Sequence, residues 1–278
     1  MFIEYFPSRL NSDLKNIEFE NLIELRIRIG FPIIAKTINN RILLNKTVYK
    51  SDIEYIINEL TEHSIYAHND KILQGYLIDK SGTRIGLTGE CVFDKDKIIS
   101  IKNISSLNIR FSKKINNCSK EILNKIIYNG QVLNTLIISP PTKGKTTILK
   151  DLIEKINSID KYSILLIDER GEFATITGKN IDSIRFCNKN YAFSIAIRSM
   201  APDIVITDEI SSSEDWAYLV NAVNCGVNII ATCHGSSLKN IRNKDGFNNK
   251  IFDRYIVLKS YGLPGVVDFI YNGEFKVI

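Results

Sequence analysis

The stretch V-L-N-T-L-I-I-S-P-P-T-K-G-K-T-T, residues 132–147, decides the fold. Its first part, from Leu133 to Ser139, is a nearly continuous apolar run, which is typical of a strand buried on both faces of a parallel sheet. The sequence G-K-T-T follows, and residues from Thr146 to Ile156 then have helical spacing. A buried strand, a tight loop and a helix in this order predict an α/β sheet that binds a phosphate group at a helix N-terminus.

The loop between this strand and helix, residues 139–147, is called the phosphate loop below. It follows the pattern G-x-x-x-x-G-K-[ST], except that Ser139 stands at the first glycine position. Lys145 would reach the β- and γ-phosphates of ATP and the Thr146 hydroxyl would bind Mg²⁺, while Gly144 would allow close approach of the main chain. Lys143 would face solvent. The predicted ATP-binding residues are Ser139, Pro140, Pro141, Thr142, Lys143, Gly144, Lys145, Thr146 and Thr147.

Apolar runs recur along the rest of the chain, and helical segments separate most of them. The four runs are residues 163–167, 204–207, 228–232 and 255–258. This alternation favours a doubly wound, mostly parallel sheet.

The first half of the chain reads instead as a smaller α/β module. Residues 23–30 alternate apolar and charged side chains, residues 51–60 have helical spacing, residues 76–93 suggest a hairpin and residues 107–111 a strand. We therefore expect an N-terminal docking or assembly domain over residues 1–124 and a P-loop domain over residues 125–278.

Two acidic pairs stand at the ends of apolar runs, where ligands of open α/β sheets bind. The first is Asp168-Glu169, in I-D-E-R-G-E (167–172), and the second is Asp208-Glu209, in I-V-I-T-D-E-I (204–210). The second has Walker B form, in which Asp208 would bind Mg²⁺ directly or through water and Glu209 would polarise the attacking water. One such pair alone could be a helix cap or a surface turn. Two pairs after the same loop favour catalysis.

Three further side chains are candidates for sensing the γ-phosphate. Arg198, in A-I-R-S-M-A-P-D (196–203), would stabilise charge in its own or a neighbouring subunit, or it would pair with Asp203. His234 ends an apolar run in A-T-C-H-G (231–235) and could hydrogen-bond to the γ-phosphate, although a lone histidine is often structural. Arg254 is a candidate that would act on a neighbouring subunit.

Composition excludes several classes of protein. With 44% hydrophobic and 24% charged residues the chain has a globular composition. A net charge of +5 without a basic stripe interleaved with aromatic residues leads us to expect no nucleic-acid partner. The odd number of five cysteines, without C-x-x-C spacing, argues against a disulfide framework or a zinc site and favours the cytoplasm. No apolar run is long enough for a transmembrane helix.

The order of these motifs resembles the stage III sporulation protein AA family, relatives of the type II and type IV secretion ATPases. The resemblance extends over most of the chain, because the first half adds E-L-R-I-R-I-G-F-P (24–32), G-T-R-I-G-L-T-G-E (82–90) and I-S-S-L-N-I-R (104–110). It implies a RecA-like P-loop ATPase that assembles as a homo-oligomer, a hexameric ring. The ring would dock from the cytoplasm at the inner face of a membrane, on the mother-cell side of a channel between mother cell and forespore.

The resemblance also implies residue roles. Glu169 and Glu209 would be catalytic carboxylates, and His234 and Arg198 nucleotide sensors. The family's usual phosphate loop is G-P-P-G-x-G-K-T, so this sequence departs from it at three positions, Ser139, Thr142 and Lys143.

Three functions are consistent with the sequence. The first, which we expect, is an ATP-hydrolysing motor of a membrane-associated secretion or channel complex. The second is a RecA-like ATPase acting on nucleic acid, for which four arginines could line a groove: Arg26, Arg28, Arg84 and Arg110. The third is a scaffold that binds nucleotide only to assemble, which Ser139 alone supports.

Overall fold

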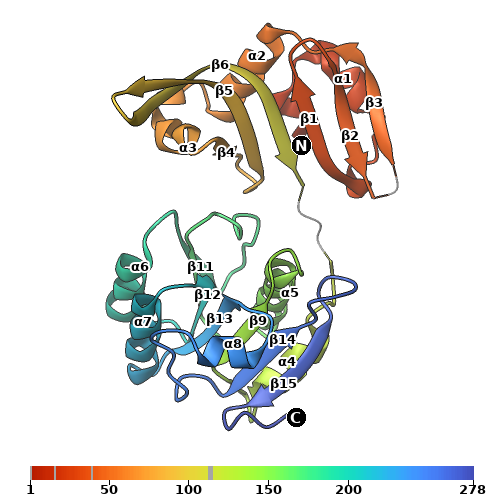
Figure 1. Ribbon diagram of the computed structural model, residues 1–278. Coiled ribbons are helices and arrows are strands. Elements are labelled where there is room, and N and C mark those ends of the chain that lie inside the picture. Colours follow the sequence, from red (N-terminus) through yellow and green to blue (C-terminus); the bar gives the residue numbers. More distant parts are fainter. Residues whose placement is uncertain (1, 16, 39, 112–114) are drawn as a thin grey trace. The chain divides into compact units, whose positions relative to one another are not determined.

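The structure is a computed structural model that describes residues 2–15, 17–38, 40–111 and 115–278 (Figure 1). The chain divides into two compact units, Met1–Lys113 and Lys114–Ile278. The boundary expected from the sequence lies later, after residue 124. The division comes earlier because helix α4 (Lys120–Ile126) buries Ile122 and Ile126 in the core of the second unit.

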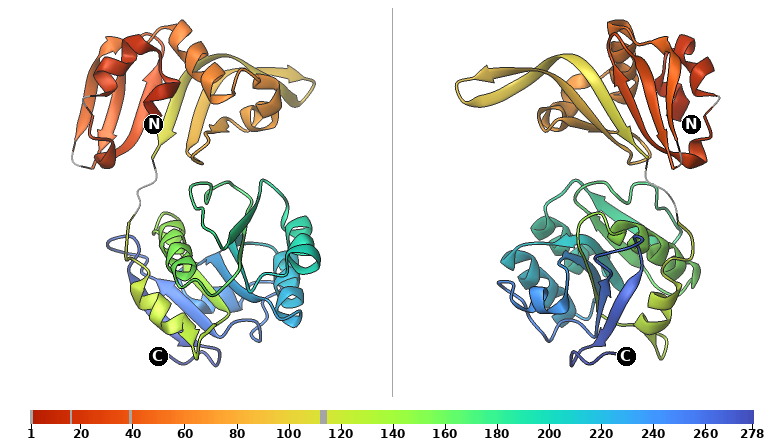
Figure 2. Two further views of the ribbon diagram at one scale, coloured as in Figure 1. Left: turned by 180° about the vertical axis from the view of Figure 1, so that it is seen from behind. Right: turned by 45° about the vertical axis from the view of Figure 1, so that its right-hand side comes forward.

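The first unit is an antiparallel sheet with helices against one face (Figure 2). Its strand order is β3-β2-β1-β6-β5-β4. The strands are β1 (Leu22–Arg28), β2 (Pro32–Thr37), β3 (Arg41–Thr47), β4 (Tyr76–Ile78), β5 (Arg84–Asp94) and β6 (Lys97–Arg110). The helices are η1 (Phe2–Tyr5), α1 (Ser8–Leu14), η2 (Phe19–Asn21), α2 (Lys50–Leu60), η3 (Ile65–His68) and α3 (Asn69–Leu73). The alternation in β1 buries Leu25 and Ile27 and exposes Arg26 and Arg28 on the face opposite the core.

The second unit contains a seven-stranded sheet in the order β11-β10-β12-β13-β9-β14-β15. Its strands are β9 (Thr135–Ser139), β10 (Ile164–Asp168), β11 (Ile181–Arg185), β12 (Ile204–Ile210), β13 (Asn228–His234), β14 (Arg254–Leu258) and β15 (Val267–Asn272). All neighbours pair in parallel except β14 and β15. The five predicted buried runs are β9, β10, β12, β13 and β14, so this part of the sequence analysis is confirmed.

Helices cover both faces of this sheet, as a doubly wound fold requires (Figure 1). Helices α4 and α5 (Lys145–Ser158) lie against one face, and α6 (Lys189–Ile195), α7 (Ser213–Asn224) and α8 (Leu238–Arg242) against the other. A π-helical turn, η4 (Ala196–Met200), extends α6, and β7 (Ile127–Tyr128) and β8 (Gln131–Val132) form a short ribbon. Because the parallel strands run in one direction, the loops after β9, β10, β12 and β13 gather at one edge. In the part of the chain that the structure describes, no helix has both the length and the apolar character needed to cross a bilayer.

Candidate active site

The phosphate loop joins the end of β9 to the first turn of α5. Gly144 is the N-cap of α5 and has a φ of 84°, which a residue with a Cβ adopts only at a cost. An added Cβ would also lie 2.8 Å from the amide nitrogen of Gly265. Gly265 belongs to the loop between β14 and β15, and its amide donates to the carbonyl of Lys143 at 2.9 Å. The glycine is therefore required by both conformation and space.

Lys145 begins α5, and its ammonium group is buried at the start of this helix. The Nζ atom is buried and makes no hydrogen bond with any described residue. Burial lowers the pKa of Lys145, and the nearby Glu209, Cys233 and Glu172 act in the opposite direction. A buried cation at a helix N-terminus, where main-chain amides are also unpaired, is suited to an anionic ligand.

Thr146 and the turn after β10 meet beside the loop. The Thr146 hydroxyl donates to Oε2 of Glu172 at 2.8 Å. The turn is held by Asp168, whose carboxylate oxygens accept from the amides of Glu172 at 2.8 Å and Phe173 at 2.9 Å. Asp168 is fully buried, and this burial raises its pKa. Asp168 therefore shapes the turn, and Glu172 is the carboxylate that this turn presents to the phosphate loop.

Asp208 and Glu209 lie near the end of β12, at the same edge of the sheet. One oxygen of Asp208 accepts from the Glu209 amide at 2.9 Å, whereas the other, Oδ2, is buried and has no hydrogen-bond partner among the described residues. Burial raises the pKa of Asp208 to about 6. The Glu209 carboxylate lies 3.1 Å from the guanidinium of Arg170 and 3.5 Å from Nε2 of His234. His234 in turn has Nδ1 at 3.3 Å from the carbonyl of Ser139, which brings this histidine to the phosphate loop.

Glu169 faces a different cation. Its Oε2 is 2.5 Å from Nζ of Lys189, the first residue of α6. The same ammonium lies 3.8 Å from Oδ2 of Asp215, at the start of α7. Glu169, Glu209 and His234 are therefore all at the carboxyl edge of the sheet, but Glu169 and Glu209 are held by separate cations.

The remaining loop residues have local contacts. Ser139 is buried at the end of β9, and its hydroxyl donates to the carbonyl of Pro140 at 2.9 Å. Thr142 has a φ of 64°, and its hydroxyl donates to the carbonyl of Pro141 at 2.6 Å. The Lys143 ammonium, expected in solvent, lies at the surface 3.4 Å from the carbonyl of Gly262.

Arg198 is not gathered with these residues. Helix α6 begins at the carboxyl edge with Lys189, and Arg198 stands nine residues later. Since a helix rises about 1.5 Å per residue, Arg198 lies roughly 13 Å away along the helix, toward the opposite edge. It lines a separate pocket of about 210 Å³ with Phe193 and Tyr218. Arg198 is therefore remote from the phosphate loop of its own chain.

Arg254 also begins its strand at the opposite, amino edge of the sheet. It is paired in register with Thr135, the first residue of β9. Its Nε donates to the carbonyl of Lys125 at 3.0 Å. This contact gives Arg254 a structural role within its own chain.

Sequence reasoning missed three side chains at the site, which are Arg170, Glu172 and Lys189. Arg170 and Glu172 lie within the quoted segment 167–172, directly after a strand end, and this position was the available signal. Lys189 follows an edge strand that no apolar run marked, so the sequence offered no comparable signal.

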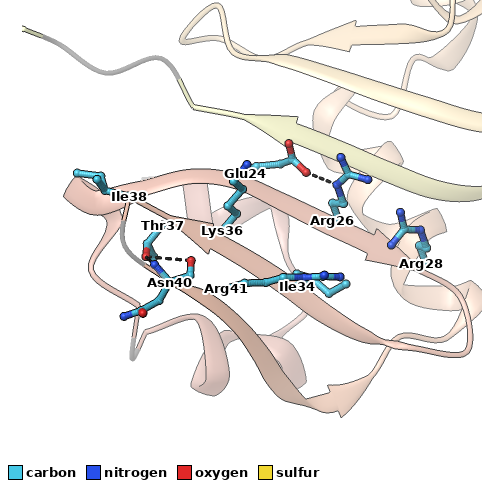
Figure 3. Close-up of a pocket in the computed structure, with 9 residues that line it drawn as sticks. All are labelled: Glu24, Arg26, Arg28, Ile34, Lys36, Thr37, Ile38, Asn40 and Arg41. Atoms are coloured by element: carbon cyan, nitrogen blue, oxygen red, sulfur yellow. Dashed lines mark hydrogen bonds and ion pairs between the residues drawn. The ribbon is translucent and has the colours of Figure 1, made fainter. Parts of the chain in front are cut away.

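A second pocket, of about 450 Å³, lies on the open face of the sheet in the first unit (Figure 3). Arg26 pairs there with Glu24, while Arg28, Lys36 and Arg41 have no ion-pair partner among the residues that the structure describes. The pocket is lined by Glu24, Arg26, Arg28, Ile34, Lys36, Thr37, Ile38, Asn40 and Arg41. This cationic face would attract an anionic partner.

Comparisons with known proteins agree with the geometry. The family described as "Sporulation stage III, protein AA" matches residues 9–278. The chain is 30% identical over 295 residues to "Stage III sporulation protein AA" of Bacillus subtilis (strain 168), covering 99% of this chain and 95% of the relative.

Among solved structures, the Legionella pneumophila ATPase DotB is similar with a TM-score of 0.64 and 14% identity, over 98% of this chain and 79% of that one. The pilus retraction motor PilT with bound ADP is similar with a TM-score of 0.59 and 14% identity, over 90% of this chain and 76% of that one. At this identity the two likenesses show a shared fold.

Proposed function

The chain belongs to the stage III sporulation protein AA family, and we propose that it is a Mg²⁺-dependent ATPase that drives a membrane-associated channel or secretion complex in sporulation. The observation that carries this proposal is the ammonium of Lys145, which is buried at the N-terminus of α5 and has no hydrogen-bond partner in the part of the chain that the structure describes. Two more buried polar atoms at the end of β12 lack partners among the described residues, Oγ1 of Thr207 and Oδ2 of Asp208. Unpaired buried groups of this kind are costly unless a ligand completes them.

The chain's residues suit a triphosphate with Mg²⁺. The described residues contain no group of three or more His, Cys, Asp or Glu side chains that could hold a metal ion by themselves. Mg²⁺ usually keeps several waters and takes one or two protein ligands together with phosphate oxygens. Thr146 and Asp208 would supply those ligands, with the Thr146 hydroxyl exchanging its bond to Glu172. Bound Mg²⁺ would neutralise charge on the phosphates.

Hydrolysis requires a positioned water and stabilised charge. Among the carboxylates, Glu209 raises the pKa of Lys145 most strongly. Glu209 would orient the attacking water. Arg170 and His234 hold its two oxygens and would stabilise negative charge that develops at the γ-phosphate. Glu169, paired with Lys189, would be the second carboxylate of the site.

The proposal includes an assembly. Copies of the chain would form a ring, six in the form implied by the family, in which Arg198 of one copy serves the site of the next. Residues 1–113 would dock on channel or secretion proteins at the inner face of the mother-cell membrane. The B. subtilis relative's name supports the sporulation context, and the fold shared with DotB and PilT supports a motor.

Titration calorimetry and phosphate release on the full chain test the proposal. The parent should bind ATP and ADP in the presence of Mg²⁺, and Lys145→Ala should bind neither. Glu209→Gln should bind ATP but hydrolyse it about 100-fold more slowly. Lys120→Ala, at the exposed start of α4, is the matched control and should behave as the parent. The proposal fails if millimolar ATP and ADP do not bind, or if Glu209→Gln turns over at the parental rate.

The cationic face in Figure 3 favours a second candidate, an ATPase stimulated by nucleic acid. Exposed cations on one sheet face are what a phosphate backbone would contact. Binding of single-stranded DNA at low salt, with faster phosphate release that is lost in Arg28→Glu, would support it. The motor proposal expects neither effect.

A further inference from the structure

Lys189 is a buried lysine that the proposed roles leave unused. It is 5% exposed and begins α6, directly after β11 and the short turn that follows it. A lysine side chain is rarely this buried unless its charge is paired, because removal of the ammonium from water is costly. Its position therefore requires specific partners.

Those partners come from two different loops. The Lys189 ammonium lies 2.5 Å from Oε2 of Glu169, in the loop after β10, and 3.8 Å from Oδ2 of Asp215. The same Asp215 oxygen accepts from the amides of Ser211 at 2.8 Å and Ser212 at 3.0 Å, and these residues follow β12. One cation thus joins the loop that carries Glu169 to the loop that follows Asp208 and Glu209.

We propose that Lys189 is a positioning residue for hydrolysis, which fixes the Glu169 carboxylate and braces the loop after β12; this inference rests on the proposed ATPase function. Among the described residues Lys189 makes no contact with the phosphate loop. It contacts Glu169 and Asp215, and its charge also lowers the pKa of Asp208. Without its charge, the partly exposed Glu169 would turn toward water, and the loop after β12 would lose its link to the loop after β10. Small displacements of a catalytic group cost much of its rate effect.

The first test separates turnover from binding. Lys189→Met keeps the length of the side chain and removes its charge. At pH 8, well above the pKa of Asp208 of about 6, turnover should fall about 10–100-fold, while the dissociation constant for ATP stays within about threefold of the parent. Lys189→Arg should recover most of the turnover, and Lys120→Met, at the exposed start of α4, should change nothing. Unchanged turnover in Lys189→Met, or a loss of ATP affinity equal to the loss of turnover, would overturn the proposal.

The second test asks whether Lys189 acts through Glu169. If it does, the double variant Lys189→Met/Glu169→Gln should lose clearly less turnover than the product of the two single losses, because both changes remove the contact between Lys189 and Glu169. A purely structural defect would instead multiply the two losses. Multiplied losses would refute the assignment.

A third measurement does not depend on activity. In the nucleotide-free protein, amide hydrogen exchange over residues 169–173 and 211–215 should rise in Lys189→Met and remain at the parental level in Lys120→Met. If the parent fails to bind and hydrolyse ATP, the proposed function falls, yet this exchange experiment still decides whether Lys189 holds the two loops. Parental exchange in Lys189→Met would sink the inference.

Discussion

Replacing Lys145 by methionine should make the nucleotide-free protein more stable while it abolishes the response to ATP. The Lys145 ammonium is buried without a hydrogen bond from any described residue, and such a group costs about 1–3 kcal/mol. The lysine as a whole is only half-buried, so we take the lower end, about 1 kcal/mol. Methionine keeps the apolar part of the side chain and removes the unpaired charge. The midpoint of thermal unfolding should rise by about 2–4 °C.

In the presence of ATP and Mg²⁺, the parent should instead be more stable than Lys145→Met. At a concentration of 100 times its dissociation constant, ATP with Mg²⁺ would stabilise the parent by about 2.7 kcal/mol, and Lys145→Met would gain nothing. The fluorescence of the single tryptophan, Trp216, which is buried in the second unit, provides the readout. A methionine variant that unfolds at a lower temperature than the parent without nucleotide would refute the reasoning.

The difference in stability between Lys145→Met and the parent, without nucleotide, should change with pH in one direction. Burial lowers the pKa of Lys145 in the folded state, so folding disfavours its charged form. The advantage of Lys145→Met is therefore complete below the folded pKa. It should disappear as the pH rises from the folded pKa toward the ordinary lysine value of about 10.4. An advantage that grows with pH would contradict the assigned cause.

Three further predictions concern backbone strain and the protonation of buried groups. Gly144→Ala should lower the free energy of unfolding in urea by at least about 1–2 kcal/mol, because alanine at a φ of 84° is strained, and should abolish ATP binding; an unchanged midpoint would show that the turn is not strained. Burial raises the pKa of the Cys118 thiol to about 11, so a thiol reagent at pH 8 should modify the exposed Cys91 and Cys225 first, and equal rates would count against this ranking. Burial raises the pKa of Asp208 to about 6, so this carboxylate is protonated as the pH falls from about 7 to 5, and Mg²⁺-dependent ATP affinity should weaken. Calorimetry at the two pH values measures this affinity, and a constant affinity would contradict the assignment of Asp208 as a Mg²⁺ ligand.

The strands of the second unit were predictable where both faces are buried. Such strands read as nearly continuous apolar runs, as β9 and the first part of β12 do. Two strands at the sheet edges were missed. The edge strand β11, I-D-S-I-R, is half exposed and polar, and β15 pairs antiparallel at the other edge. Edge strands carry less apolar burial, so the pattern that identifies the centre of a sheet fades there.

The sequence predicted which edge of the sheet carries the candidate site, but it did not predict which side chains contact one another there. Parallel strands fix which loops gather, and this rule brought Glu209 and His234 together at 3.5 Å. The direction of a side chain depends on the turn that follows each strand, so the pairing of Arg170 with Glu209, and of Glu172 with Thr146, had no sequence signal. The catalytic roles themselves stay predictions that the variants above would test.

The hydrogen bond from the Gly265 amide to the Lys143 carbonyl ties the phosphate loop to a turn at the periphery of the sheet. A movement of the phosphate loop on nucleotide binding would either carry this turn along or break the bond. The same turn exposes Tyr261, by 67%, and Leu263, by 79%. Binding of a nucleotide at the phosphate loop would then shift two large apolar side chains on the protein surface, Tyr261 and Leu263, where a neighbouring molecule could contact them.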